Sequence, residues 1–117
     1  VGFTVWDHSD RRTIYLLNAD WTSDQEQRPA TFIYKGKRFP VAVRRYHIET
    51  IHCADGLAVM PASNTTDILS VCKKENGWAV KAQTTGNDIV QCMNAVTGKV
   101  EPIKFDKPGV HEVFVNE

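Results

Sequence analysis

Residues 76–83 read NGWAVKAQ, and this stretch carries the clearest structural signal in the chain. An Asn-Gly pair favours the tight turn of a β-hairpin, because the central positions of that turn need a positive φ. After the turn, apolar and polar residues alternate, so that Trp78 and Val80 share one face of a strand and Lys81 lies on the other. The stretch therefore predicts a β-hairpin whose second strand packs Trp78 into a core.

The same two-residue period continues in both directions from this hairpin. Further turn signals are Lys-Gly-Lys at 35–37, Asp-Gly at 55–56, Thr-Gly-Asn at 85–87 and Pro-Gly at 108–109. Between the turns we count about ten or eleven short strands, and no stretch shows a helical period with an apolar face. The sequence predicts an all-β, antiparallel fold with no substantial helix. A sandwich fits better than a barrel, because several strands are apolar on one face only.

The composition is that of a single globular domain. The chain has 117 residues, 14 basic and 14 acidic side chains, and 42% hydrophobic residues. No apolar run approaches the roughly 20 residues of a membrane-spanning helix, and the balanced charge argues against a dedicated nucleic-acid binder. The chain begins at Val1 without a signal-peptide pattern. We interpret residues 1–117 as one β-sandwich domain of a longer chain, the alternative being a processed mature protein.

Three cysteines, Cys53, Cys72 and Cys92, lie in or beside predicted strands. An odd number leaves at least one thiol unpaired, and neither Cys-x-x-Cys nor zinc-finger spacing occurs. A free cysteine in a strand behaves as a small apolar residue. We therefore expect buried thiols, with one disulfide as the alternative. The pattern indicates no metal site and no cofactor.

Residues with catalytic potential do not form a catalytic pattern. His8, Ser9 and Asp10 are consecutive in a predicted turn, and consecutive side chains do not converge as those of a nucleophile triad do. His47 and His52 would lie on opposite faces of a straight strand, which makes them a poor metal pair. A glycosidase needs two carboxyl groups about 5–10 Å apart across a cleft, and the short turns leave little material for one. We expect a domain that is not an enzyme by itself.

A basic cluster interleaved with aromatic residues spans positions 32–46. Its members are Lys35, Lys37, Arg38, Arg44 and Arg45, with Phe32, Tyr34, Phe39 and Tyr46. The pattern fits a hairpin with inward aromatic and outward charged residues, which protects a sheet edge from aggregation. It also fits a site for an acidic sugar polymer or for single-stranded nucleic acid, although the zero net charge disfavours nucleic acid. Pro40 cannot donate a ladder hydrogen bond, so we expect its strand at an edge or at a bulge.

The aromatic residues divide into two groups. Trp6, Tyr15, Tyr34 and Trp78 fit core positions. Trp21 stands in the longest polar loop, where we expect it at the surface. There it would stack on a sugar, contact a neighbouring domain, or fold back to cap the sandwich. The candidate ligand-binding residues are therefore Trp21, Arg44 and Tyr46.

Residues 12–21, RTIYLLNADW, resemble the opening hairpin of C-terminal β-sandwich domains of bacterial carbohydrate-active enzymes. Residues 29–43, 55–61 and 78–113 are similar in pattern to later hairpins of such domains. The resemblance implies a non-catalytic accessory domain of a secreted or periplasmic glycoside hydrolase or polysaccharide lyase. The implied partners are the catalytic domain of the parent chain and a polysaccharide, without nucleic acid or membrane insertion. The alternatives are an autonomous carbohydrate-binding module or a protein–protein adaptor.

Overall fold

The computed structural model describes residues 2–17, 27–44, 48–63 and 65–117. These residues form eleven β-strands and no helix, so no membrane-spanning helix is found among them. The strands are β1 (Gly2–Asp7), β2 (Arg12–Leu17), β3 (Gln27–Tyr34), β4 (Lys37–Arg44), β5 (Ile48–Ala54), β6 (Leu57–Pro61), β7 (Asp67–Lys74), β8 (Gly77–Thr85), β9 (Asp88–Asn94), β10 (Val100–Phe105) and β11 (Pro108–Asn116).

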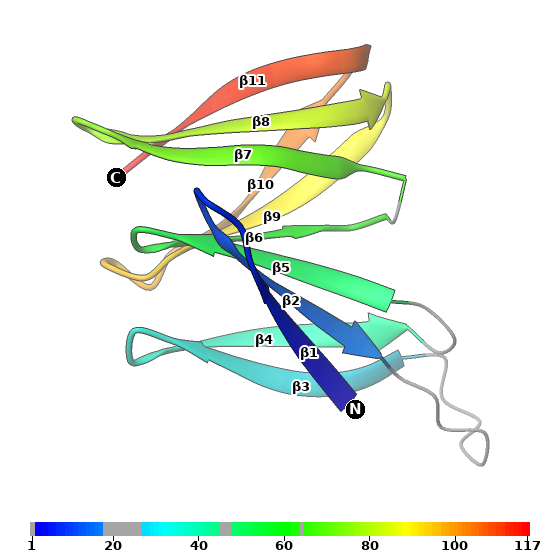
Figure 1. Cartoon of the computed structure of the whole chain (residues 1–117), viewed down its shortest axis with the longest axis vertical. Coiled ribbons are helices and arrows are strands. Elements are labelled where there is room, and N and C mark those ends of the chain that lie inside the picture. Colours follow the sequence, from blue (N-terminus) through cyan, green and yellow to red (C-terminus); the bar gives the residue numbers. More distant parts are fainter. Residues whose placement is uncertain (1, 18–26, 45–47, 64) are drawn as a thin grey trace.

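The strands pair antiparallel in three sheets (Figure 1). The largest has six strands in the order β1-β2-β5-β6-β9-β10, a second has the order β11-β8-β7, and β3 and β4 form a separate hairpin. In Figure 1 the three-stranded sheet lies above the middle of the six-stranded sheet and the β3–β4 hairpin lies below it. The predicted all-β antiparallel architecture is confirmed, and the sheets stack as in a sandwich. Of the two positions predicted for Pro40, the edge is confirmed, because among the described strands β4 pairs with β3 alone.

The six-stranded sheet is covered on both faces by apolar clusters. Along β6, Leu57 and Val59 belong to the cluster under β7, β8 and β11, together with Trp78. Ala58 points to the opposite face and joins the cluster under the β3–β4 hairpin, together with Phe39. Residues 51–54 and 57–59 are consequently all buried. A strand buried on both faces loses the polar-apolar alternation of a half-exposed strand.

Most of the predicted turns are present. Lys35 and Gly36 have φ values of 50° and 79°, and Asp55 and Gly56 have values of 47° and 94°, as a type I′ hairpin turn requires. The hairpin of residues 76–83 forms, but its two-residue turn is 75–76, and Gly77 begins β8. A Cβ at Gly77 would lie 2.0 Å from the carbonyl oxygen of Val115, so this glycine permits the close approach of β8 and β11. The predicted turn at 108–109 is wrong, because Pro108 begins β11.

Two aromatic residues predicted for the core lie at the surface instead. Trp6 is 61% exposed and Tyr15 is 38% exposed, whereas Trp78 is fully buried as predicted. Tyr34 is half-buried, and its hydroxyl accepts a hydrogen bond from the backbone N–H of Gly56 at 3.1 Å. Neither apolar cluster includes a residue of β1, which is an edge strand of the six-stranded sheet. The strand predicted for this segment is present, but the predicted core position of Trp6 is wrong.

Candidate functional site

An apolar groove of about 330 Å³ runs between β1–β2 and β3. We call it the β1–β3 groove. Its apolar lining comprises Phe3, Val5, Ile14, Leu16, Phe32 and Ile33. Phe3 is 71% exposed and Ile33 is 61% exposed, which is unusual for such large apolar side chains. Both β1 and β3 have one edge without a strand partner among the described residues. The groove therefore combines exposed apolar side chains with two edge strands, β1 and β3.

Basic side chains cluster at the turn end of the β3–β4 hairpin, whose strand β3 forms one side of the β1–β3 groove. Arg38 stands directly across from Ile33, and Lys37 stands across from Tyr34. The ammonium of Lys35 lies 5.8 Å from the centre of the Tyr34 ring. These three cations are exposed and form no ion pair within the described part of the chain. The predicted hairpin with inward Phe39 and outward charges is confirmed, and Arg38 is the basic residue paired with a residue that lines the groove, Ile33.

Of the three residues predicted to bind a ligand, Arg44 lies in the described structure. Its Nε donates to Oε1 of Glu49 at 2.5 Å, and Glu49 is only 4% exposed. Arg44 also lines an open pocket of about 510 Å³ with Pro40, Met60 and Gln91. The guanidinium therefore neutralises a buried carboxylate, and its second role in ligand binding stays a prediction. Trp21 and Tyr46 lie outside the described residues.

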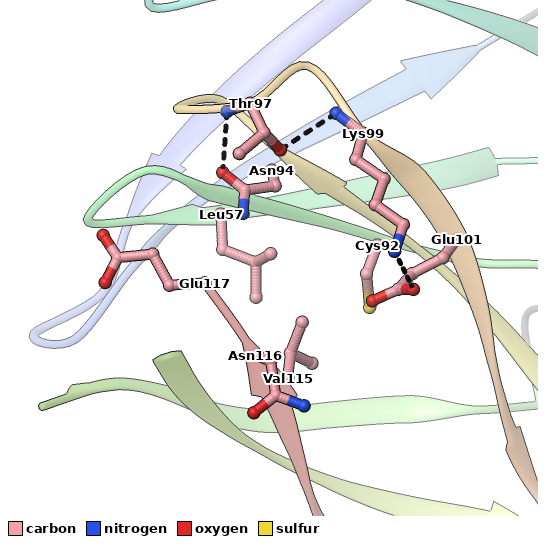
Figure 2. A pocket seen from close by; sticks show the side chains of 9 residues that line it. All are labelled: Leu57, Cys92, Asn94, Thr97, Lys99, Glu101, Val115, Asn116 and Glu117. Carbon is pink, nitrogen blue, oxygen red and sulfur yellow. Dashed lines mark hydrogen bonds and ion pairs between the residues drawn. The ribbon is translucent and has the colours of Figure 1, made fainter. Parts of the chain in front are cut away.

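A more polar pocket of about 210 Å³ lies between the β9–β10 turn and the end of β11 (Figure 2). Its polar groups are engaged with one another: Lys99 pairs with Glu101 at 3.3 Å, and Oδ1 of Asn94 accepts from the backbone N–H groups of Val96 and Thr97. Figure 2 shows Asn94, Thr97 and Lys99 linked around the turn. These contacts close the turn, and we assign this pocket a structural role.

The thiols differ from the prediction in one case. Cys53 and Cys92 are buried as expected, but Cys72 is exposed, because it alternates with the buried Val71 on β7 and points to solvent. All three are free thiols. Burial raises the pKa of both Cys53 and Cys92 to about 12, so these two stay protonated at neutral pH. A protonated thiol is neither a good nucleophile nor a good metal ligand.

The sequence reasoning did not identify Phe3, Val5 or Ile33 as surface residues. The available signal was that β1 and β3 are apolar at positions on both faces. Such a pattern is typical of a strand covered on both sides, and also of an edge strand that presents one apolar face to a partner. Sequence alone does not separate these two cases.

Comparison with known proteins found no matching family model, no similar curated protein and no similar solved structure.

Proposed function

We propose that this chain is a non-catalytic accessory domain of a larger carbohydrate-active enzyme and that it packs on another domain of that protein through the β1–β3 groove. The exposure of Phe3 and Ile33 on the two sides of the groove carries the proposal. Burying one such side chain stabilises a complex by about 1.5–3 kcal/mol. The link to a carbohydrate-active enzyme comes from the resemblance of residues 12–21 and 29–43.

The charges on the hairpin that forms one side of the groove favour a partner surface of particular chemistry. Arg38, Lys35 and Lys37 are exposed and lack carboxylate partners within the described chain. A complementary surface would carry an apolar ridge for the groove and carboxylates beside it. Opposite charges at the rim speed association and fix its register, while the apolar centre supplies most of the affinity. We therefore commit to an apolar, acid-bordered face of a neighbouring domain as the occupant.

The test uses the full product of the reading frame that encodes this chain. Ile33→Asp places a carboxylate in the groove. Val110→Asp on β11 is the matched control, because Val110 is 51% exposed and does not line the groove. Backbone amide exchange of β1 and β3 is measured in the full product and in the 117-residue chain.

In the wild type, we expect exchange in β1 and β3 to be at least about tenfold slower in the full product than in the isolated chain. Ile33→Asp should remove this difference, and Val110→Asp should preserve it. Equal exchange rates in the two wild-type proteins would overturn the proposal. So would a reading frame that encodes no further domain.

A further inference from the structure

A second exposed surface lies on the opposite face of β1 from Phe3 and Val5. In the strand register Trp6 pairs with Thr13, and Tyr15, two residues further along β2, pairs with Thr4. Trp6 and Tyr15 are therefore diagonal neighbours on one sheet face, about 7–8 Å apart at their Cα atoms. Both rings are accessible to solvent. Exposed aromatic rings on a regular sheet form a rigid, apolar binding platform, because the strands fix their positions.

A small pocket of about 160 Å³ adjoins this platform beside Tyr15. It lies between β5 and the segment that leads into β7, and its polar lining includes Thr50, His52, Ser63 and Asp67. Pockets for drug-sized ligands measure about 300–1,000 Å³. This pocket is suited to one ring of a ligand, with the remainder of the ligand lying across Tyr15 and Trp6.

The hydrogen bonds of His52 determine which hydrogen-bonding groups the pocket offers to a ligand. Nε of Arg11 lies 3.2 Å from Nδ1 of His52, and a guanidinium only donates. Nδ1 is therefore the acceptor, and the ring proton is on Nε2, which donates to the Thr50 hydroxyl at 3.2 Å. The hydroxyl proton of Thr50 is then free to donate to a ligand. Burial and the charge of Arg11 lower the pKa of His52 to about 4, so the imidazole is neutral at physiological pH.

The charges of the pocket exclude anionic ligands. None of the described residues that line it is Lys or Arg. Nearby Arg11 is engaged by Asp10 at 2.9 Å and by the carbonyl groups of Ile68 and Leu69 at 3.0 and 3.2 Å. Asp67 has no hydrogen bond within the described chain, so its exposed carboxylate is free to accept from a ligand and repels anions. A suitable ligand is uncharged and rich in hydroxyl groups.

We propose that Trp6, Tyr15 and the adjoining pocket form a binding site for a neutral saccharide, here called the Trp6–Tyr15 site. The aromatic rings contact the apolar C–H faces of the sugar units, and Thr50 and Asp67 bind hydroxyl groups of the unit in the pocket. The site does not depend on domain docking, because the β1–β3 groove uses the other face of β1. Both surfaces can be occupied at once.

The test is affinity electrophoresis of the 117-residue chain in native gels at alkaline pH. The gels contain a dissolved neutral polysaccharide, namely xylan, glucomannan, galactomannan or hydroxyethylcellulose, or the acidic polygalacturonate. The variants are Trp6→Ala, Tyr15→Ala and Thr50→Val. Phe114→Ala is the matched control, because Phe114 is a 48% exposed aromatic residue on β11. Circular dichroism confirms that each variant folds.

We expect at least one neutral polysaccharide to retard the wild type. Trp6→Ala and Tyr15→Ala should each weaken that binding about tenfold or more, which corresponds to about 1.4 kcal/mol, and Phe114→Ala should leave it unchanged. The proposal is overturned if no neutral polysaccharide binds, or if Phe114→Ala weakens binding as much as Trp6→Ala. Binding of polygalacturonate alone would also overturn it and would place the ligand at the basic hairpin residues. None of these results bears on docking, which amide exchange tests in the full product.

Discussion

Arg11 and His52 are joined by a hydrogen bond of 3.2 Å from Nε to Nδ1, although 41 positions separate them in the sequence. The same guanidinium donates to the carbonyl groups of Ile68 and Leu69 on β7. The Arg11 side chain therefore connects the β1–β2 turn by hydrogen bonds to β5 in the same sheet and to β7 in the covering sheet. This connection holds the edge of the Trp6–Tyr15 site in place, and it depends on a neutral imidazole.

The first prediction concerns pH. Unfolded His52 binds a proton near its ordinary pKa of 6.5, whereas in the folded chain its pKa is lowered to about 4. The unfolded state therefore binds more protons between these values, and stability falls as the pH is lowered. The contribution of His52 is complete above about pH 6.5, and its loss by pH 4 amounts to about 3 kcal/mol. Urea unfolding followed from pH 7 to pH 4 measures this loss.

The control for this prediction is His52→Gln. This variant should reduce the dependence of the free energy of unfolding on pH between pH 6.5 and 4, even if the overall stability decreases. Further loss in stronger acid has a separate source. Burial alone would raise the pKa of Asp88, but hydrogen bonds from Thr66, Thr85 and Gly86 outweigh it and lower the pKa to about 2. A slope that persists unchanged in His52→Gln would show that another group titrates in this range.

The second prediction concerns the thiols. Cys72 is exposed, and Cys53 and Cys92 are buried with raised pKa values. A bulky maleimide should therefore modify one thiol in the native chain, and all three only after unfolding. Mass spectrometry of the labelled peptides identifies the modified residue. Native labelling of Cys53 or Cys92 at the rate of Cys72 would be incompatible with the two-sided burial of the six-stranded sheet.

The third prediction compares two tryptophans that share an alternating strand pattern. Trp78 is fully buried, and its indole N–H donates to the carbonyl oxygen of Asp55 at 3.1 Å. Trp78→Ala should cost about 3–5 kcal/mol of the free energy of unfolding. Trp6 is 61% exposed, so Trp6→Ala should change that free energy by about 0.5 kcal/mol or less. Urea denaturation midpoints provide the comparison, and similar losses for both variants would place Trp6 in a core.

The fourth prediction compares two glycines in hairpins. A methyl group at Gly77 would lie 2.0 Å from the carbonyl oxygen of Val115, whereas one at Gly36 would meet nothing within 4 Å. Gly77→Ala must displace β11 and should lower the free energy of unfolding by about 3 kcal/mol. Gly36→Ala meets only the strain of its φ of 79° and should cost about 1–2 kcal/mol. Thermal unfolding of both variants tests the difference, which would vanish if β11 did not approach β8 closely.

Local features of the fold could be predicted from the sequence because they depend on neighbouring residues. The turns at Gly36 and Gly56 follow from the positive φ that a two-residue hairpin turn needs. The inward position of Trp78 follows from the two-residue period of a strand.

Only the tertiary structure decides which strand faces are covered by a second sheet. Alternation identifies residues that share a face, but whether a second sheet lies over that face depends on contacts between distant segments. The three-stranded sheet covers residues of β5, β6, β9 and β10 and leaves Trp6 on β1 exposed. Cys72 is exposed because it lies on the outer face of that sheet. Likewise, Thr13 and His52 are buried as a polar pair because β2 lies beside β5, a pairing that no local pattern encodes. The sequence by itself therefore determined the strands and their faces, and the packing of the three sheets determined which faces stayed exposed.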